Sequence, residues 1–199
     1  IPAEAANRFK QGLDLLAQHD KAKDWDEASC TATAQVFLDA AKEHEKPFAE
    51  AFYDAGLSYQ RCKKNAEAKA QFQKALDADA KFHPAKTQLL MMSFYEGGEK
   101  NLDQAIADMR QTAVVDAQYK NVEALVALAM LYMKRGNNVA DNDGTSDYQR
   151  AKRYLQSALA VDDGYMPAFN QLALFYLESA KQAAGQAKSS KSATNIGKK

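Results

Sequence analysis

The sequence has little proline, glycine or cysteine and no excess of charge of either sign. Among its 199 residues are 4 Pro, 9 Gly and 2 Cys, while alanine is abundant, a balance that favours helices throughout. Lys+Arg and Asp+Glu are equal at 26 each, so no net electric field draws the chain toward nucleic acid or an anionic membrane. No apolar run approaches the ~20 residues of a membrane span. These absences predict a helical protein that neither binds nucleic acid nor spans a membrane.

A repeat of about 34 residues organises the chain. Its clearest copy runs from Ala49 to Phe82 and resembles the tetratricopeptide repeat (TPR) over its full length. Small residues of the repeat let two antiparallel helices approach each other, while aromatic side chains fill the gaps between them. The residues that match the motif are Phe52, Ala55, Gly56 and Tyr59 in the first helix and Ala68, Phe72 and Ala75 in the second.

The same spacing recurs, with insertions, on both sides of this copy. All four prolines sit just before an expected first helix, where the missing N–H costs nothing. The second helix of the N-terminal unit is ambiguous in register. We expect a single domain over 1–184, with a degenerate unit at 1–46, repeats at 47–82, 83–119 and 120–165, the first helix of a further unit at 166–184, and a disordered basic tail at 185–199.

The TPR resemblance implies both a fold and a surface. TPR proteins are all-α, and their antiparallel helix pairs stack into a superhelical solenoid with a concave groove. In this family the first helix of each pair lines the groove. Carried onto this sequence, the partner-binding groove residues are Tyr53, Leu57, Gln60, Arg61, Thr87, Met91, Phe94, Val126, Met130, Met133, Asn170 and Leu174.

This expected groove is apolar, and its composition excludes one use known in the family. Chaperone-binding relatives place Lys and Asn there to clamp a C-terminal carboxylate, whereas Tyr53 and Leu57 occupy two of those positions here. An apolar groove with methionines fits an amphipathic helix or an extended segment of a partner protein. The other interpretation is ordinary core, covered by the chain's own C-terminal helix or by repeats outside this sequence.

The two cysteines stand at matching heights of one expected helix hairpin. The turn between their helices falls near Lys46, midway between Cys30 and Cys62. This placement meets one condition for a disulfide, because bridged residues need Cα atoms that lie close together. A bridge predicts an oxidising compartment such as a periplasm. The alternative is a pair of buried free thiols.

No group of residues has the spacing of a catalytic or metal site. The sequence contains no Gly-rich phosphate loop and no nucleophile elbow, and its histidines have no partners at catalytic or ligand spacing. These histidines are His19, His44 and His83. We therefore expect no enzyme activity, no cofactor and no metal.

A polar insertion at 137–149 is the segment that most resembles an ion-binding loop. Asp141, Asp143 and Asp147 could offer oxygen ligands to calcium. The glycine is misplaced for an EF-hand, however, and Lys152 stands where its bidentate Glu belongs. A flexible loop, with Asp147 capping the next helix, is the favoured interpretation.

The last part of the chain carries a narrower resemblance. The stretch DDGYMPAFNQLALFYLESAKQAAG, within 148–185, is similar to envelope TPR proteins of the bacterial adventurous gliding motility machinery. This resemblance implies a periplasmic or outer-membrane location and a role as the scaffold of a multiprotein complex. The alternative location is the cytoplasm. The alternative function is a self-assembling structural protein whose groove is filled by its own chain or by copies of itself.

Overall fold

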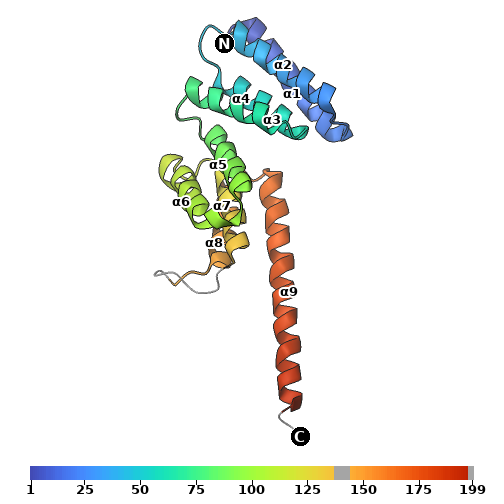
Figure 1. Cartoon of the computed structure of the whole chain (residues 1–199), viewed down its shortest axis with the longest axis vertical. Helices are drawn as coiled ribbons and strands as arrows, with labels where there is room; N and C mark the ends of the chain where they lie inside the picture. Colours follow the sequence, from blue (N-terminus) through green and yellow to red (C-terminus); the bar gives the residue numbers. More distant parts are fainter. Residues whose placement is uncertain (137–143, 197–199) are drawn as a thin grey trace. The chain divides into compact units, whose positions relative to one another are not determined.

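The computed structural model describes the backbone of residues 1–136 and 144–196, with all of their side chains except those of 99, 182, 183 and 186–196. This part of the chain is built of α-helices packed in adjacent pairs and contains no strand (Figure 1). The helices are α1 (Ala3–Ala22), α2 (Glu27–Glu43), α3 (Ala49–Arg61), α4 (Asn65–Ala78), α5 (His83–Gly97), α6 (Leu102–Arg110), α7 (Val122–Arg135), α8 (Asp147–Val161) and α9 (Met166–Ile196). A short 3-10 helix (Glu99–Asn101) precedes α6, and a π-helical segment (Gln111–Asp116) follows it. The all-α class of TPR-like helix pairs is confirmed.

The helices form two compact units, Ile1–Asn101 and Leu102–Lys199. In the first unit each helix from α1 to α4 packs on the helix that follows it in the chain. In the second unit α6 and α8 both pack on α7, and α9 packs on α8 and α7. The division falls inside the expected repeat 83–119, so its two helices, α5 and α6, belong to different units.

Close approach at two glycines determines how the first two helix pairs pack. A Cβ atom added to Gly12 would lie 2.6 Å from the ring of Phe37, and one added to Gly56 would lie 2.5 Å from the ring of Phe72. Both rings are fully buried. Each aromatic side chain of a second helix therefore fills a space that only a glycine of the first helix leaves open.

The same contact settles the register of α2, which is ambiguous in the sequence. Phe37 of α2 corresponds to Phe72 of α4, and the residues four before and three after them correspond as well. These residues are Thr33 and Ala40 in α2, and Ala68 and Ala75 in α4, all of them buried. The pair formed by α1 and α2 is thus TPR-like, with Thr33 in the place of the usual alanine.

The centre of the second unit is α7, whose apolar residues are buried on several sides. The Tyr132 ring stacks on Tyr154 of α8 with centroids 5.8 Å apart. At the end of α7, the Arg135 guanidinium donates two hydrogen bonds of 2.6 and 2.8 Å to the carboxylate of Asp147, which is only 1% exposed. Since a buried carboxylate needs such a partner, this pair fixes the start of α8 against the end of α7.

The N-cap of α8 differs from the prediction. Ser146, not Asp147, is the capping residue, because its hydroxyl accepts a hydrogen bond from the backbone N–H of Gln149. The Gln149 side chain accepts one from the Ser146 N–H in return, which completes a capping box. Asp147 is the first residue of the helix. The other two aspartates considered as calcium ligands lie in 137–143, outside the described residues.

The last helix is longer than the first helix that the sequence predicts at 166–184. Its backbone is helical from Met166 to Ile196 and so enters the segment for which the sequence predicts disorder. No proline follows Pro167, so none interrupts the helix. The extension over 185–196 contains more Ser than Ala, so its composition gives no strong preference for a helix. Neither α9 nor any other described helix is apolar over enough residues to cross a membrane.

Gly56→Ala tests the close contact between paired helices. In an exposed helix this substitution stabilises by roughly 1 kcal/mol. At position 56 the new methyl group meets the Phe72 ring, so we expect the free energy of unfolding to fall by about 1–3 kcal/mol in urea denaturation followed by circular dichroism.

Gly185→Ala in α9 is the matched control, because no atom lies within 4 Å of its Cβ position. It should leave stability unchanged or raise it. If both substitutions stabilise the protein to the same extent, the helices do not pack as described.

Candidate functional site

Three of the expected groove residues in the first unit lie in its core. Tyr53 is 8% exposed, and its ring contacts those of Phe72 and Phe82 at centroid distances of 5.6 and 5.4 Å. Thr87 and Phe94 are buried as well. A buried side chain offers no surface to a partner. Any partner-binding surface of this unit is therefore formed by other residues than these three.

Each of the first helices of this unit, α1, α3 and α5, carries an aliphatic side chain that keeps part of its surface exposed. Leu57 and Met91 are half-buried, and Leu13 is 42% exposed. Leu13 and Leu57 each follow the glycine on which the second helix packs, Gly12 or Gly56, so they take equivalent places in their pairs. We refer to Leu13, Leu57 and Met91 as the unit 1 stripe. Leu13 is not among the groove residues predicted from the sequence. Its place directly after Gly12, like that of Leu57 after Gly56, could have identified it.

Polar groups tie the first helices together beside this stripe. The Gln60 amide of α3 donates a hydrogen bond of 3.1 Å to Gln88 of α5. The Arg61 guanidinium donates two, of 2.8 and 2.9 Å, to the carboxylate of Asp20 in α1, and Trp25 Nε1 donates a third of 2.7 Å. Hydrogen bonding by Arg61 holds the pKa of Asp20 below its ordinary value. Arg61, an expected groove residue, thus holds α3 against α1.

A shallow hollow of about 330 Å³ opens at the ends of α3 and α5 and the start of α4. Its walls combine apolar and polar side chains, and Tyr95 is 65% exposed there. The lining residues are Gln60, Asn65, Met92, Tyr95 and Glu96. The hollow lies on α3 and α5, which also carry Leu57 and Met91 of the stripe.

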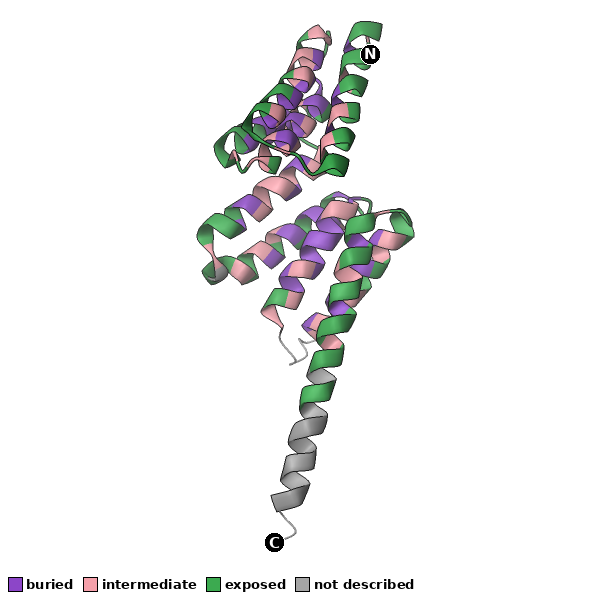
Figure 2. Cartoon of the chain, turned by 90° about the vertical axis from the view of Figure 1, so that its right-hand side faces the viewer, coloured by how far each residue is buried: buried purple, intermediate pink, exposed green. Residues whose placement is uncertain are grey.

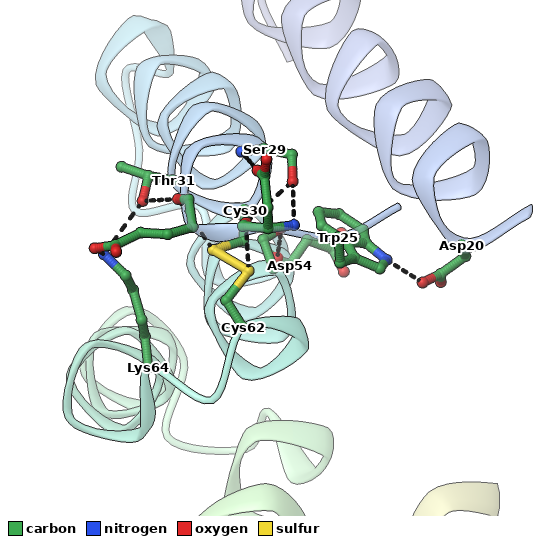
Figure 3. The surroundings of a disulfide bond; sticks show 11 residues. Asp20, Trp25, Ser29, Cys30, Thr31, Asp54, Cys62 and Lys64 are labelled. Carbon is green, nitrogen blue, oxygen red and sulfur yellow. Dashed lines mark hydrogen bonds and ion pairs between the residues drawn. A yellow bond between two sulfur atoms is a disulfide. The ribbon is translucent and has the colours of Figure 1, made fainter. Parts of the chain in front are cut away.

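A disulfide joins Cys30, near the start of α2, to Cys62, at the end of α3 (Figure 3). The Cα atoms are 6.2 Å apart, within the range that a disulfide requires. Beside the bridge, the Lys64 ammonium group forms an ion pair of 2.8 Å with Glu27 and a longer contact of 3.4 Å with Thr31. The predicted disulfide is confirmed, and it links the first helix pair to the second.

The expected groove residues of the second unit lie on α7 and α9. Val126 is buried, whereas Met130 and Met133 are half-buried. Asn170 and Leu174 are exposed, the latter by 47%. This unit therefore also carries aliphatic surface on its first helices, most of it on α9.

The histidines make local contacts. His19 Nδ1 lies 2.7 Å from the carboxylate of Asp24, and His44 Nδ1 lies 2.6 Å from the carbonyl oxygen of Lys46. His83 opens α5. Within the residues that the structure describes, no three His, Cys, Asp or Glu side chains gather where they could hold a metal ion.

Comparisons with known proteins add a likeness to solved structures to these observations. No protein-family model and no curated protein matches the sequence. Among solved structures, the chain is similar to one described as "MamA RS-1 ArsTM double mutant", with 18% sequence identity and a TM-score of 0.48 over 94% of this chain and 93% of that chain. A likeness at this level carries no argument about function, and none of the comparisons connects the chain to gliding motility.

Removal of the disulfide is expected to destabilise the first unit. In the chain-entropy model a bridge that closes a loop of this length contributes about 3–4 kcal/mol. The double variant Cys30→Ala/Cys62→Ala should therefore unfold at a lower urea concentration than the oxidised protein. Reductant should lower the unfolding midpoint of the parent protein and leave that of the variant unchanged. A parent midpoint that does not move after complete reduction, verified by mass spectrometry, is the contrary result.

Proposed function

We propose that the chain is a non-enzymatic scaffold that binds a helix or an extended segment of a partner protein along the unit 1 stripe. The observation that carries the proposal is the repeated exposure of an aliphatic side chain, Leu13, Leu57 or Met91, on three successive first helices. A segment that crosses these helices would contact each of them in turn. TPR-like helix pairs present surfaces of this kind to proteins.

The polar contacts beside the stripe favour binding by holding the surface in place before the partner arrives. The ion pair of Arg61 with Asp20 joins α3 to α1, and the hydrogen bond of Gln60 with Gln88 joins α3 to α5. A preformed surface loses less conformational entropy on binding, while the flexible Met91 side chain can adapt to the shape of the segment. A suitable ligand carries aliphatic side chains for the stripe and one larger side chain for the hollow beside Tyr95.

The disulfide supports an oxidising compartment, and we propose that the protein is periplasmic or associated with the outer membrane. Disulfides persist in such compartments and are rare in the reducing cytosol. The cytoplasm is the alternative. Because residues 148–185 resemble envelope proteins of the gliding motility machinery, we propose that the partner belongs to a bacterial envelope or motility complex.

Self-assembly is the second candidate function, and it rests on α9. Several large apolar side chains of this helix are exposed, and copies of the chain could cover them. These side chains are Met166, Phe169, Leu174, Tyr176 and Leu177. Light scattering distinguishes the two functions, because oligomers that grow with concentration in the absence of a partner favour self-assembly.

A double substitution on the stripe tests the proposed function. Leu13→Glu with Met91→Glu places two carboxylates on the binding surface, and burying unpaired charge is unfavourable. We expect roughly tenfold less partner to be recovered by a crosslinking pull-down from the native organism.

The control is Val115→Glu with Val161→Glu, because these valines of the second unit are 60% and 48% exposed. It adds the same charge at residues that do not belong to the stripe and should leave recovery unchanged. Circular dichroism establishes that both variants are folded. Equal recovery with the stripe variant, the control and the parent would show that the stripe is not the binding surface.

A further inference from the structure

The two sulfur atoms of the disulfide differ in their access to solvent. Cys30 is 0% exposed, whereas Cys62, at the end of α3, is partly exposed (Figure 3). In the first unit the buried residues lie mostly within the helices, and the turns at the helix ends are largely exposed (Figure 2). A thiolate in solution can therefore reach the sulfur of Cys62, and not that of Cys30, while the unit stays folded.

Cys62 lies in the wall of an open hollow of about 400 Å³, which we call the disulfide hollow. The hollow is formed by the end of α3 and the turn after it, together with the segment that leads into α2. Its lining residues are Trp25, Asp26, Glu27, Arg61, Cys62, Lys63 and Lys64. A hollow of this size can hold a small molecule, so a thiol of low molecular mass has room beside Cys62.

The disulfide hollow contains three cationic side chains, and two of them are paired. The Arg61 guanidinium forms an ion pair of 2.8 Å with Asp20. The Lys64 ammonium group forms one of 2.8 Å with Glu27. Lys63 is exposed, and none of the carboxylates that the structure describes pairs with it. Its charge lies directly after Cys62 in the chain and attracts an anionic thiol.

The remaining carboxylate in the lining, that of Asp26, is engaged by α2. It accepts a hydrogen bond of 2.7 Å from the backbone N–H of Ser29. The positive end of the helix dipole offsets its negative charge. The ammonium group of Lys63 is therefore the charge in this hollow that is left to meet a ligand.

The surroundings of Cys30 suit it to leave as a thiolate. It is the fourth residue of α2, within the first turn, where the helix dipole favours the negative charge of a thiolate. A thiol that is more easily deprotonated is also the better leaving group in disulfide exchange. Once protonated, the Cys30 thiol has a hydrogen-bond acceptor in the carbonyl oxygen of Glu27, 3.4 Å from its sulfur.

We propose that Cys62 is a modification site, at which a small anionic thiol forms a mixed disulfide by opening the bridge to Cys30. The thiolate of the small molecule attacks Cys62 Sγ and forms the new S–S bond, while the bond between Cys62 and Cys30 breaks. The electron pair of the broken bond goes to Cys30, which leaves as a thiolate and takes a proton from water. The attacking thiol is oxidised and Cys30 is reduced, so the exchange needs no other oxidant or reductant. The link between the first two helix pairs is thereby opened.

The position of the adduct tests this inference. The folded chain is incubated briefly with 2-mercaptoethanesulfonate, the reaction is stopped with acid, free thiols are labelled with a maleimide, and peptide mapping by mass spectrometry locates both groups. We expect at least about tenfold more adduct on Cys62 than on Cys30, because only Cys62 is accessible. The maleimide should be found on Cys30. In concentrated urea both sulfur atoms are accessible, so the unfolded chain should give a ratio within about threefold of one.

A charge reversal at Lys63 tests the class of thiol. Lys63→Glu should slow exchange with 2-mercaptoethanesulfonate by at least about threefold relative to exchange with the neutral 2-mercaptoethanol, with rates compared per thiolate. Lys81→Glu is the matched control, because Lys81 is an exposed lysine between α4 and α5. Lys63 precedes α4 and Lys81 follows it, so this helix, about 20 Å long, separates them. The control should leave both rates unchanged.

The proposal is overturned if the folded chain forms no adduct, or if the adduct is distributed over the two cysteines as it is in the unfolded chain. The preference for an anionic thiol is overturned if Lys63→Glu slows both thiols alike or slows neither. The inference goes beyond the proposed scaffold function and does not depend on it. The pull-down with Leu13→Glu and Met91→Glu reports on the stripe, so failure of the modification site is distinguishable from failure of the scaffold function.

Discussion

The contact between a large side chain of one helix and a small residue of its partner is the interaction on which the rest of the structure depends. Phe37 lies against Gly12 and Phe72 lies against Gly56, so close that a Cβ atom on either glycine would overlap the ring. The contact sets the distance between paired helices and thereby decides which residues of each pair are buried. The disulfide between α2 and α3 then joins two pairs built on the same contact.

This contact also bears on the surface of the protein. The residue after each glycine, Leu13 or Leu57, keeps part of its surface exposed beside the pair. Large apolar side chains of α9, among them Phe169 and Tyr176, are exposed as well. The protein thus presents apolar surface both beside its helix pairs and along α9.

The fold could be predicted from the sequence because glycine and aromatic residues recur at the spacing that close helix packing requires. The disulfide could be predicted as well, since the turn between the two helices lies midway between Cys30 and Cys62. The exposure of individual groove positions could not, because it depends on neighbours outside the motif: Phe82, beyond the end of α4, packs on Tyr53. The exposure of Phe169 and Tyr176 on α9 could not be predicted either, because the motif marks which residues can pack and not which of them a neighbouring helix covers.

Local details escaped prediction for similar reasons. Ser146 and Asp147 are both good helix caps, and only the position of Arg135, which binds Asp147, decides between them. The register of α2 was ambiguous because Thr33 stands where the motif has alanine. The helix continues to Ile196, where the sequence predicts a disordered basic tail, because Ser and Lys outnumber Ala after residue 184.

Methyl NMR of the methionines tests the central claim most directly, because Met91 belongs to the unit 1 stripe whereas Met109 is fully buried in the second unit. With the methionine methyl groups labelled, saturation with the partner recovered from the native organism is expected to shift or broaden the Met91 signal and to leave the Met109 signal in place. A Met91 signal that is unchanged in the saturated complex would contradict the account.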